Sequence, residues 1–345
     1  MRGVIVEEHG GGVHRVPAAE HLALTSAVLT DLGAPPGPAR EQAEMLLEGD
    51  LRGHASHGIR RLPVLAERIA HGVLDPAAEP EPVWRTDSVL TVDGGTGLGP
   101  PVAHRAVEAL LARVPGTGVA VAAIRRAGHL GMLAPYVERM AAAGVAGIAT
   151  TTSEALVHPW GAAPAMIGTN PIAVAIPTAG EPVVLDMATG SISRGKVLDH
   201  AARGEPLPAG AAVDATGSPT TDATAALDGA ISPFGGPKGY ALALVLELLV
   251  ASLTGTALGR DVRGTLDTTE PVTKGDLLIA FAPTAFGTGT PLDPFLDELR
   301  ALEPAPGHHG VQVPGDRARA VRARNLAVGV PVDRTTWEQV RALRT

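Results

Sequence analysis

The stretch SVLTVDGGTGLGPPVAHRAVEALLARVPGTGVAVAAI, residues 88–124, carries the pattern that decides the fold. Residues 88–92 and 119–124 are apolar runs of strand length, and residues 102–114 between them have apolar side chains at helical spacing. Such alternation predicts an α/β domain. The glycine-rich residues 94–100 follow a strand and precede a helix, but the third glycine of G-x-G-x-x-G would fall at Pro100. A tight turn is therefore favoured over a dinucleotide fingerprint.

Strands and helices continue to alternate after this stretch as far as residue 281. The first 75 residues instead read as helices, and Pro76, Pro80 and Pro82 mark a boundary after them. We predict a helical domain, residues 1–80 with 318–345, and an α/β domain, residues 81–317; residues 1–13 receive no role. Further strands are expected at 145–151, 172–176, 183–187 and 277–281, further helices at 17–32, 38–51, 59–72, 133–143 and 240–253, and ordered loops at 203–222 and 303–315.

Composition excludes several classes of protein. The 345-residue chain has no cysteine, so disulfides and thiolate zinc sites are excluded and a reducing, cytoplasmic location is expected. A net charge of −8 provides no overall basic surface for nucleic acid. The longest apolar run, residues 240–253, contains Glu247 and falls short of the ~18–20 residues of a membrane span. We expect neither nucleic acid nor a membrane as a partner.

Two common catalytic signatures are missing from the sequence. No G-x-x-x-x-G-K-[ST] phosphate loop exists, because Pro237 directly precedes Lys238, and no H-E-x-x-H zinc motif is present. His54 and His57 are three residues apart and could share a helical turn, but no third ligand is evident. A metal-dependent hydrolase built on them remains an alternative, whereas our prediction includes no metal.

Residues 50–61, DLRGHASHGIRR, concentrate polar chemistry between two predicted helices. A histidine with a pKa near neutrality can donate a proton to a forming alkoxide. A nearby arginine can bind a carboxylate through two hydrogen bonds. The segment is thus a candidate catalytic loop, with a solvated helix junction as the structural alternative.

Three further segments place polar residues at the ends of predicted elements. His129 follows a strand, where ligand sites of α/β folds lie, or it caps the next helix. Asp186 ends another strand and could bind ribose hydroxyls, orient a base or cap the following element. Lys238 opens the apolar helix near 240–253, where helix amides and a positive charge suit a pyrophosphate, although it could be an ordinary first-turn residue.

Taken together and in order, these segments resemble the malate/L-lactate dehydrogenase family of atypical nicotinamide enzymes, which includes ureidoglycolate dehydrogenases, sulfolactate dehydrogenases and piperideine-2-carboxylate reductases. The resemblance covers roughly residues 16 to 330. It implies a non-Rossmann dinucleotide-binding α/β domain plus a helical domain, NAD or NADP with NAD favoured, a small carboxylate substrate and a homodimer. The matching segments are 50–61, 128–131, 159–161, 168–171, 186–189, 194–197, 219–222, 236–240 and 314–316.

The resemblance also implies roles for individual residues. His57 matches a proton donor, Ser56 its relay and Asp186 an acidic partner. His129 matches the proton-transfer histidine of ureidoglycolate dehydrogenases, so the two histidines compete for that role. Arg61 matches a substrate-carboxylate contact and Ser153 a substrate-side residue. Positions matching cofactor contacts are Thr169, Asn170, Asp186, Met187, Ala188, Lys238, Gly239, Gly315, Asp316 and Arg317.

Two departures from the family pattern stand out. Residues 261–273 lack an arginine where the ureidoglycolate enzymes would contact substrate; Arg263 and Lys274 are the nearest positive charges. This difference speaks against ureidoglycolate as substrate. Ala211-Ala212 replaces a tryptophan that is frequent before Val213 in the family.

The resulting hypothesis is an NAD(P)-dependent oxidoreductase that transfers a hydride between cofactor and a small 2-hydroxy or 2-oxo acid. The cofactor supplies the redox chemistry, and the protein supplies orientation and charge. The first alternative is an NADPH-dependent reductase of a cyclic 2-imino acid of the piperideine or pyrroline type. The second is a non-catalytic, cofactor-binding relative.

Overall fold

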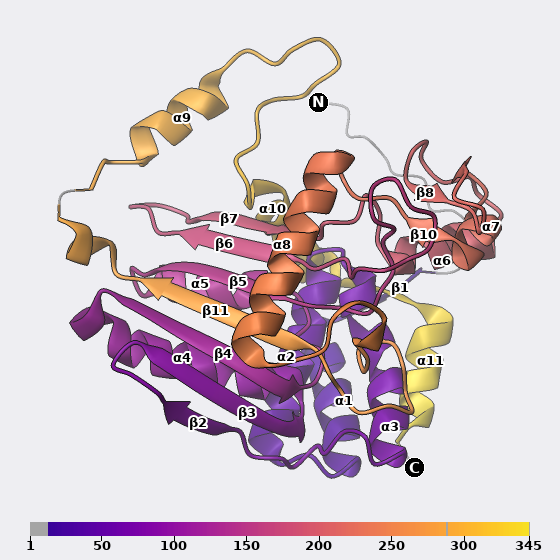
Figure 1. The fold of residues 1–345 in the computed structure, drawn as a ribbon, viewed down its shortest axis with the longest axis horizontal. Coiled ribbons are helices and arrows are strands. Elements are labelled where there is room, and N and C mark those ends of the chain that lie inside the picture. Colours follow the sequence, from indigo (N-terminus) through magenta and orange to yellow (C-terminus); the bar gives the residue numbers. More distant parts are fainter. Residues whose placement is uncertain (1–12, 288, 345) are drawn as a thin grey trace.

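The computed structural model describes residues 13–287 and 289–344; residues 1–12, for which the sequence indicates no role, lie outside that part. Its centre is a seven-stranded sheet in the order β2-β3-β4-β11-β5-β6-β7 (Figure 1). The β3–β4 pair is parallel and every other pair is antiparallel. The predicted α/β class is confirmed, and the sheet is not the parallel one of a Rossmann domain. The strands are β2 Glu81–Trp84, β3 Val89–Gly97, β4 Val119–Ala127, β5 Ala146–Thr151, β6 Ile172–Ile176, β7 Val183–Met187 and β11 Gly275–Phe281.

The glycine-rich segment at 94–100 differs from its prediction. β3 continues through most of it to Gly97, with a register shift after Asp93 and positive φ angles at Gly95 (59°) and Thr96 (65°). A Cβ at Gly94 would lie 2.7 Å from the Arg126 carbonyl oxygen, so glycine allows β3 and β4 to approach. The tight-turn interpretation is therefore wrong: the glycines form a β-bulge that ends the strand.

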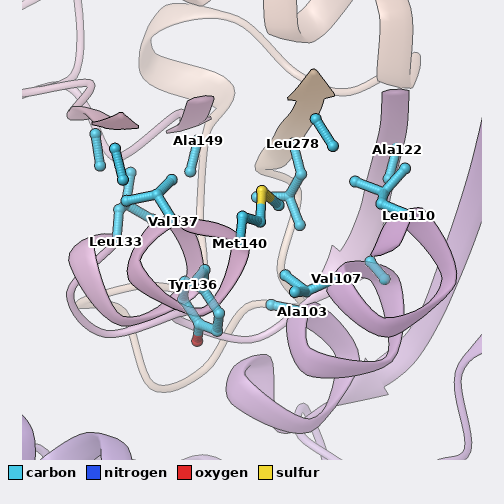
Figure 2. Close-up of a cluster of buried hydrophobic side chains, with 14 of the residues drawn as sticks. Ala103, Val107, Leu110, Ala122, Leu133, Tyr136, Val137, Met140, Ala149 and Leu278 are labelled. Atoms are coloured by element: carbon cyan, nitrogen blue, oxygen red, sulfur yellow. The ribbon is translucent and has the colours of Figure 1, made fainter. Parts of the chain in front are cut away.

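Helices cover both faces of the sheet, and alternation along the strands assigns each face. Ala122 of β4 and Leu278 of β11 pack in the main core with helices α4 Gly99–Thr117 and α5 Ala134–Ala142. Their neighbours Ala123 and Leu277 pack with Val250 of α8 Pro237–Thr254 on the opposite face. Figure 2 shows Val107, Leu110, Val137 and Met140 directed from α4 and α5 toward the sheet.

Helix α8 is the one described helix that is long and apolar enough to cross a membrane by length and composition. It lies across the sheet and contacts β4, β5 and β11 (Figure 1). Glu247 is buried in it, 2% exposed, and accepts hydrogen bonds from the backbone amides of Gly168 and Gly259. These contacts are those of a helix packed within a folded domain.

The two ends of the chain meet in a second core. β1 Val13–Val16 pairs with β12 Val330–Asp333, and Val28, Leu46 and Trp337 are buried in one cluster. The domain boundaries at residues 80 and 318 stay a prediction. The helices here are α1 Ala18–Asp31, α2 Pro36–Leu51, α3 Leu62–Ala70, α10 Asp316–Val328 and α11 Arg334–Ala342.

The segment 203–222, expected as loop, contains two of the three strands of a small sheet, β8 and β9. Strands of two residues are too short to leave a period in the sequence. The remaining elements are β8 Ala212–Val213, β9 Pro219–Thr220, β10 Ala230–Ile231, α6 Arg194–Arg203, α7 Ala223–Asp228, α9 Asp293–Ala301, η1 Ala55–His57, η2 Ile59–Arg61, η3 Gly259–Asp261 and η4 Pro283–Phe286.

Candidate active site

The segment after α2 folds into two consecutive 3-10 turns, η1 and η2, and the side chain of Asp50 anchors them. The carboxylate of Asp50 accepts a hydrogen bond from the Ile59 amide at 2.8 Å and contacts Nε2 of His21 at 2.9 Å. Burial raises the pKa of Asp50, against the opposing effect of His21. A Cβ at Gly58 would lie 1.8 Å from Oδ1 of Asp50, so the glycine lets the backbone lie directly against this carboxylate. This anchored turn fixes the position of His57.

His57, on η1, faces His129, which follows β4. The ring centroids are 5.3 Å apart and the planes are inclined at 37°. Oγ of Ser56 lies 3.0 Å from Nδ1 of His57. Burial, followed by the positive charge of Arg61, lowers the pKa of His57 to about 3. The Ser56–His57 pair of the sequence prediction is thus within hydrogen-bond reach, and the lowered pKa favours the neutral form of His57 at neutral pH.

His129 occupies the turn between β4 and α5, as its place after a strand predicts. Its Nδ1 accepts a hydrogen bond from the Gly131 amide at 3.1 Å. Burial lowers its pKa well below the ordinary range, and the charges of Arg61, His57 and Lys274 act in the same direction. Both effects favour the neutral form of the His129 ring.

Arg61 lies in the same pocket as His129. Its Nε donates to the Ser56 carbonyl oxygen at 3.1 Å and its Nη1 to the Thr265 carbonyl oxygen at 2.6 Å. Burial lowers its pKa to about 10, so the guanidinium keeps its charge at neutral pH. The residues lining this pocket are Gln42, Leu46, Arg61, Val64, Leu65, Arg68, Leu74, His129, Gly264 and Thr265.

Three charged groups of this pocket region were not singled out from the sequence as site residues. Arg68 is 2% exposed and its Nη1 donates to the carbonyl oxygens of Asp267 and Glu270. Oε1 of Glu154 accepts the backbone amides of residues 265, 266 and 267. Lys274 is buried and pairs with Asp276 at 2.5 Å. The sequence held one signal for Arg68: it is a charged residue inside the apolar run that forms α3.

Ser153 and the 168–171 segment form one hydrogen-bonded unit. Oγ of Ser153 accepts from the Thr169 amide at 2.9 Å and lies 3.2 Å from its Oγ1. Nδ2 of Asn170, which is fully buried, donates to Oε2 of Glu247 at 2.7 Å. Ser153 and Thr169 thus lie together after the end of β5, and the hydrogen bond from Asn170 to Glu247 links this unit to α8.

Asp186 lies near the end of β7, as predicted, and its Oδ2 accepts the amides of Leu133 and Ala134 at 3.0 and 2.8 Å. Burial raises its pKa to about 6. These bonds cap the N-terminus of α5. In the described part of the chain, no hydrogen bond joins Asp186 to either histidine. Met187 and Ala188 follow it, half-buried and exposed respectively.

The other residues matched to cofactor contacts lie at helix starts. Lys238 is exposed in the first turn of α8, which contains no acidic residue. Gly239 is buried, and a Cβ there would meet the Phe234 carbonyl oxygen at 1.8 Å. Gly315 precedes α10 with φ 101°. Asp316 binds Arg300 and Arg319, whereas the neighbouring Arg317 is exposed.

A cationic cluster lies beside the Ser56–His57 turn. It comprises Lys196 of α6 and Arg317 of α10, which lie near His54; partial burial and then the charges of Arg317 and Lys196 lower the pKa of His54. A Cβ at Gly195 would lie 2.8 Å from Cβ of Ser56, so the start of α6 packs directly on η1. Within residues 13–287 and 289–344, no group of three His, Asp or Glu side chains is placed to hold a metal.

Comparisons with known proteins identify the family of the chain. A family model described as malate/L-lactate dehydrogenase matches residues 16–341. The chain is 35% identical to the malate/(S)-sulfolactate dehydrogenase of Methanothermus fervidus, covering 94% of this chain and 95% of the relative. It is 37% identical to a Δ1-pyrroline-2-carboxylate reductase of Pseudomonas fluorescens, covering 94% and 97%. A crystal structure of a dehydrogenase from Sinorhizobium meliloti superposes with a TM-score of 0.93 at 47% identity, covering 97% and 99%.

Proposed function

The chain belongs to the malate/L-lactate dehydrogenase family, and we propose that it acts at the pocket lined by His129 and Arg61, beside which His57 packs against His129. It is an NAD(P)-dependent oxidoreductase that transfers a hydride to or from a small hydroxy or imino acid. The observation that carries the assignment of the pocket is the 5.3 Å approach of the two imidazoles, with Arg61 lining the same pocket as His129. A proton-transfer group, a hydrogen-bond donor and a carboxylate-binding cation are thereby in reach of one small molecule.

Arg61 binds the substrate carboxylate in this proposal. Two of its nitrogens are held by backbone carbonyl groups, and Nη2 makes no hydrogen bond within the described residues. The fixed guanidinium therefore presents a preorganised donor edge, and burial strengthens its interaction with an anion. A carboxylate beside Arg61 also offsets the positive charge that depresses the pKa of His57. Substrate binding thus favours protonation of His57.

His57 then acts as the proton donor in reduction and as the acceptor in oxidation. Ser56 holds Nδ1 of His57 and positions the ring, which leaves Nε2 for the substrate. General acid catalysis of this kind contributes about 10²–10⁴-fold. Asp186 supports the site through α5, whose start it caps, and Ser153 borders the substrate side.

The cofactor is a nicotinamide dinucleotide, and we favour NAD over NADP. The donor set fits such a group, because exposed cations at helix starts (Lys238, Lys196 and Arg317) are suited to phosphates. Gly239 and Gly315 are the residues matched to cofactor contacts at two of these starts, and Thr169, Met187 and Ala188 complete the proposed contacts. When bound, the reduced nicotinamide supplies the hydride for the reduction.

The chemistry of the pocket supports two substrate types. Leu46, Val64, Leu65 and Leu74 give it an apolar side that suits the methylene groups of a cyclic 2-imino acid. Arg68, the second arginine, instead suits a substrate with a second acidic group, as in malate or sulfolactate. We favour the hydroxy acid because Nε of Arg68 is buried without a hydrogen bond.

The proposal includes a homodimer and a cytoplasmic location, the latter resting on the cysteine-free sequence. The outer face of α8 exposes Val245, Leu248 and Leu253 at 59, 47 and 51%. An apolar face of this kind on a packed helix is typical of a subunit interface. Sedimentation of Val245→Asp beside the wild type tests it: the wild type should be a dimer and the variant a monomer.

A substrate panel tests the proposed reaction. The purified protein is mixed in turn with NADH or NADPH and with pyruvate, oxaloacetate, sulfopyruvate or a cyclic 2-imino acid. We expect cofactor oxidation with the 2-oxo diacids. Turnover of the imino acid alone would select the alternative, and cofactor binding without turnover of any compound would contradict an enzymatic role.

A further inference from the structure

The two ring nitrogens of His129 have different surroundings. The amide N–H of Gly131 points at Nδ1 across 3.1 Å, so Nδ1 must provide a lone pair. A neutral imidazole has one donor and one acceptor nitrogen. The proton of His129 therefore resides on Nε2, which makes no hydrogen bond within the described residues. If Nδ1 were also protonated, its N–H would point at the N–H of the Gly131 amide, and two donors would face each other.

The turn that carries Gly131 is rigid. Gly131 has a φ of +78°, and a Cβ there would lie 2.4 Å from Cγ of Met45, so the backbone position is closed to other residues. The neighbouring Leu130 is buried, and its carbonyl oxygen accepts a hydrogen bond from Oη of Tyr136 at 2.5 Å. The Gly131 amide cannot readily turn away from the ring, and the tautomer of His129 is fixed.

The charges around His129 also oppose a second proton. Arg61, His57 and Lys274 all disfavour the imidazolium, and burial acts in the same direction. Two carboxylates in this region bind other groups: Oδ1 of Asp276 pairs with Lys274, and Oε1 of Glu154 binds three backbone amides. No described carboxylate forms an ion pair or hydrogen bond with the ring of His129.

We propose that His129 is a permanently neutral electrophile: its Nε2–H donates a hydrogen bond to the 2-oxygen of a 2-oxo acid and keeps its proton throughout the reaction. This inference rests on the proposed function of the pocket. When a hydride is added to the 2-carbon, the carbonyl π pair moves to oxygen and a C–H bond forms. His129 stabilises the growing negative charge, while the O–H bond forms with the proton of His57. A fixed N–H donor at a developing oxyanion is worth about 10²–10³-fold in rate.

Nitrogen-15 NMR of histidine-labelled protein tests the tautomer without turnover. The His129 signals are assigned by their loss in His129→Gln. We expect an unprotonated Nδ1, a protonated Nε2 and no titration between about pH 5 and 9. A protonated Nδ1, or a titration inside that range, would overturn the proposal. Because this experiment uses the free protein, its result does not depend on whether the proposed reaction is correct.

Matched variants test the role in the reaction. His129→Gln places an amide N–H near the position of Nε2, whereas His129→Asn is too short to reach it and His129→Ala has no donor. We expect turnover to fall about 10²–10³-fold in the Ala and Asn variants, with at least tenfold recovery in the Gln variant. The pH profile of the Gln variant should match the wild type. Equal loss in all three, with a flattened pH profile, would make His129 the proton carrier. Absence of wild-type turnover would instead contradict the proposed function.

Discussion

Nδ1 of His57 lies against Oγ of Ser56 at 3.0 Å, a contact that leaves the His57 ring free to gain or lose a proton. Hydroxyl groups can both donate and accept, so Ser56 accommodates either protonation state of the ring. His129 has no such freedom, because the group at its Nδ1 is a backbone amide that can only donate. This difference supports our proposal that His57 transfers the proton while His129 polarises the carbonyl group.

The first prediction concerns the pH dependence of the two directions. The pKa of His57 is lowered to about 3 in the free protein, so the neutral form needed for oxidation is fully present above about pH 5. We expect kcat/KM for oxidation to be flat between about pH 5 and 8. For reduction His57 must first take up a proton, so kcat/KM for reduction should fall about tenfold for each unit by which the pH rises over the same range. An oxidation profile with an inflection between pH 6 and 7 would be inconsistent with this assignment.

The second prediction concerns the substrate carboxylate. Arg61→Lys keeps a positive charge but loses the planar group held by the Ser56 and Thr265 carbonyl oxygens. We expect kcat/KM for 2-oxo acids to fall at least a hundredfold, with little change in the dissociation constant of the cofactor. Arg60→Lys on the same turn, where Arg60 pairs with Asp199, is the matched control. If simple ketones without a carboxylate are reduced as well as the acids, the role of Arg61 is wrong.

The third prediction concerns the cofactor. Lys238→Ala removes an exposed cation from the start of α8. Loss of one charge-assisted contact should raise the KM for the cofactor about ten- to a hundredfold, while the KM for the substrate stays within about twofold. Arg40→Ala, which removes an exposed arginine paired with Glu44 on α2, serves as the control. Equal cofactor affinity in the two variants would contradict the assignment of Lys238 to the cofactor site.

The fourth prediction concerns stability. The folded-state pKa of His57 lies below its value of 6.5 in the unfolded chain, so the unfolded state binds the extra proton more tightly between about pH 3 and 6.5. This contribution to stability is present above pH 6.5 and is lost as the pH falls. Relative to His57→Gln, the wild type should lose up to about 1.4 kcal/mol of unfolding free energy per pH unit in that window. Parallel stability curves from urea titrations of the two proteins would refute the lowered pKa.

Local patterns in the sequence were sufficient to place several site residues. His129 after β4, Asp186 near the end of β7 and Lys238 in the first turn of α8 all lie on the elements predicted for them. Each position depends only on where a short apolar run begins or ends, which periodicity reports. The resemblance carried by the order of these segments also predicted the family, and the comparisons confirm that prediction.

Contacts between distant segments could not be predicted in this way. Arg61 binds the carbonyl oxygen of Thr265, and Glu154 binds the amides of the same loop, across more than a hundred residues of chain. The bulge at the end of β3 arises because β4 lies alongside Gly94, which no local pattern reveals. The hydrogen bond from Gly131 to His129 is local, but it requires the left-handed backbone of Gly131, which the G-H-L-G sequence permits without demanding.

The central claim, that His57 carries the proton of the reaction, is tested most directly by the rate of His57→Gln in both directions, measured across pH beside the wild type. We predict a turnover about 10²–10⁴-fold lower, a reduction rate that no longer changes with pH, and a cofactor dissociation constant within about twofold of the wild type. If His57→Gln keeps near-normal turnover and the wild-type pH dependence, while His129→Gln loses both, the proton is carried by His129 and the account is contradicted.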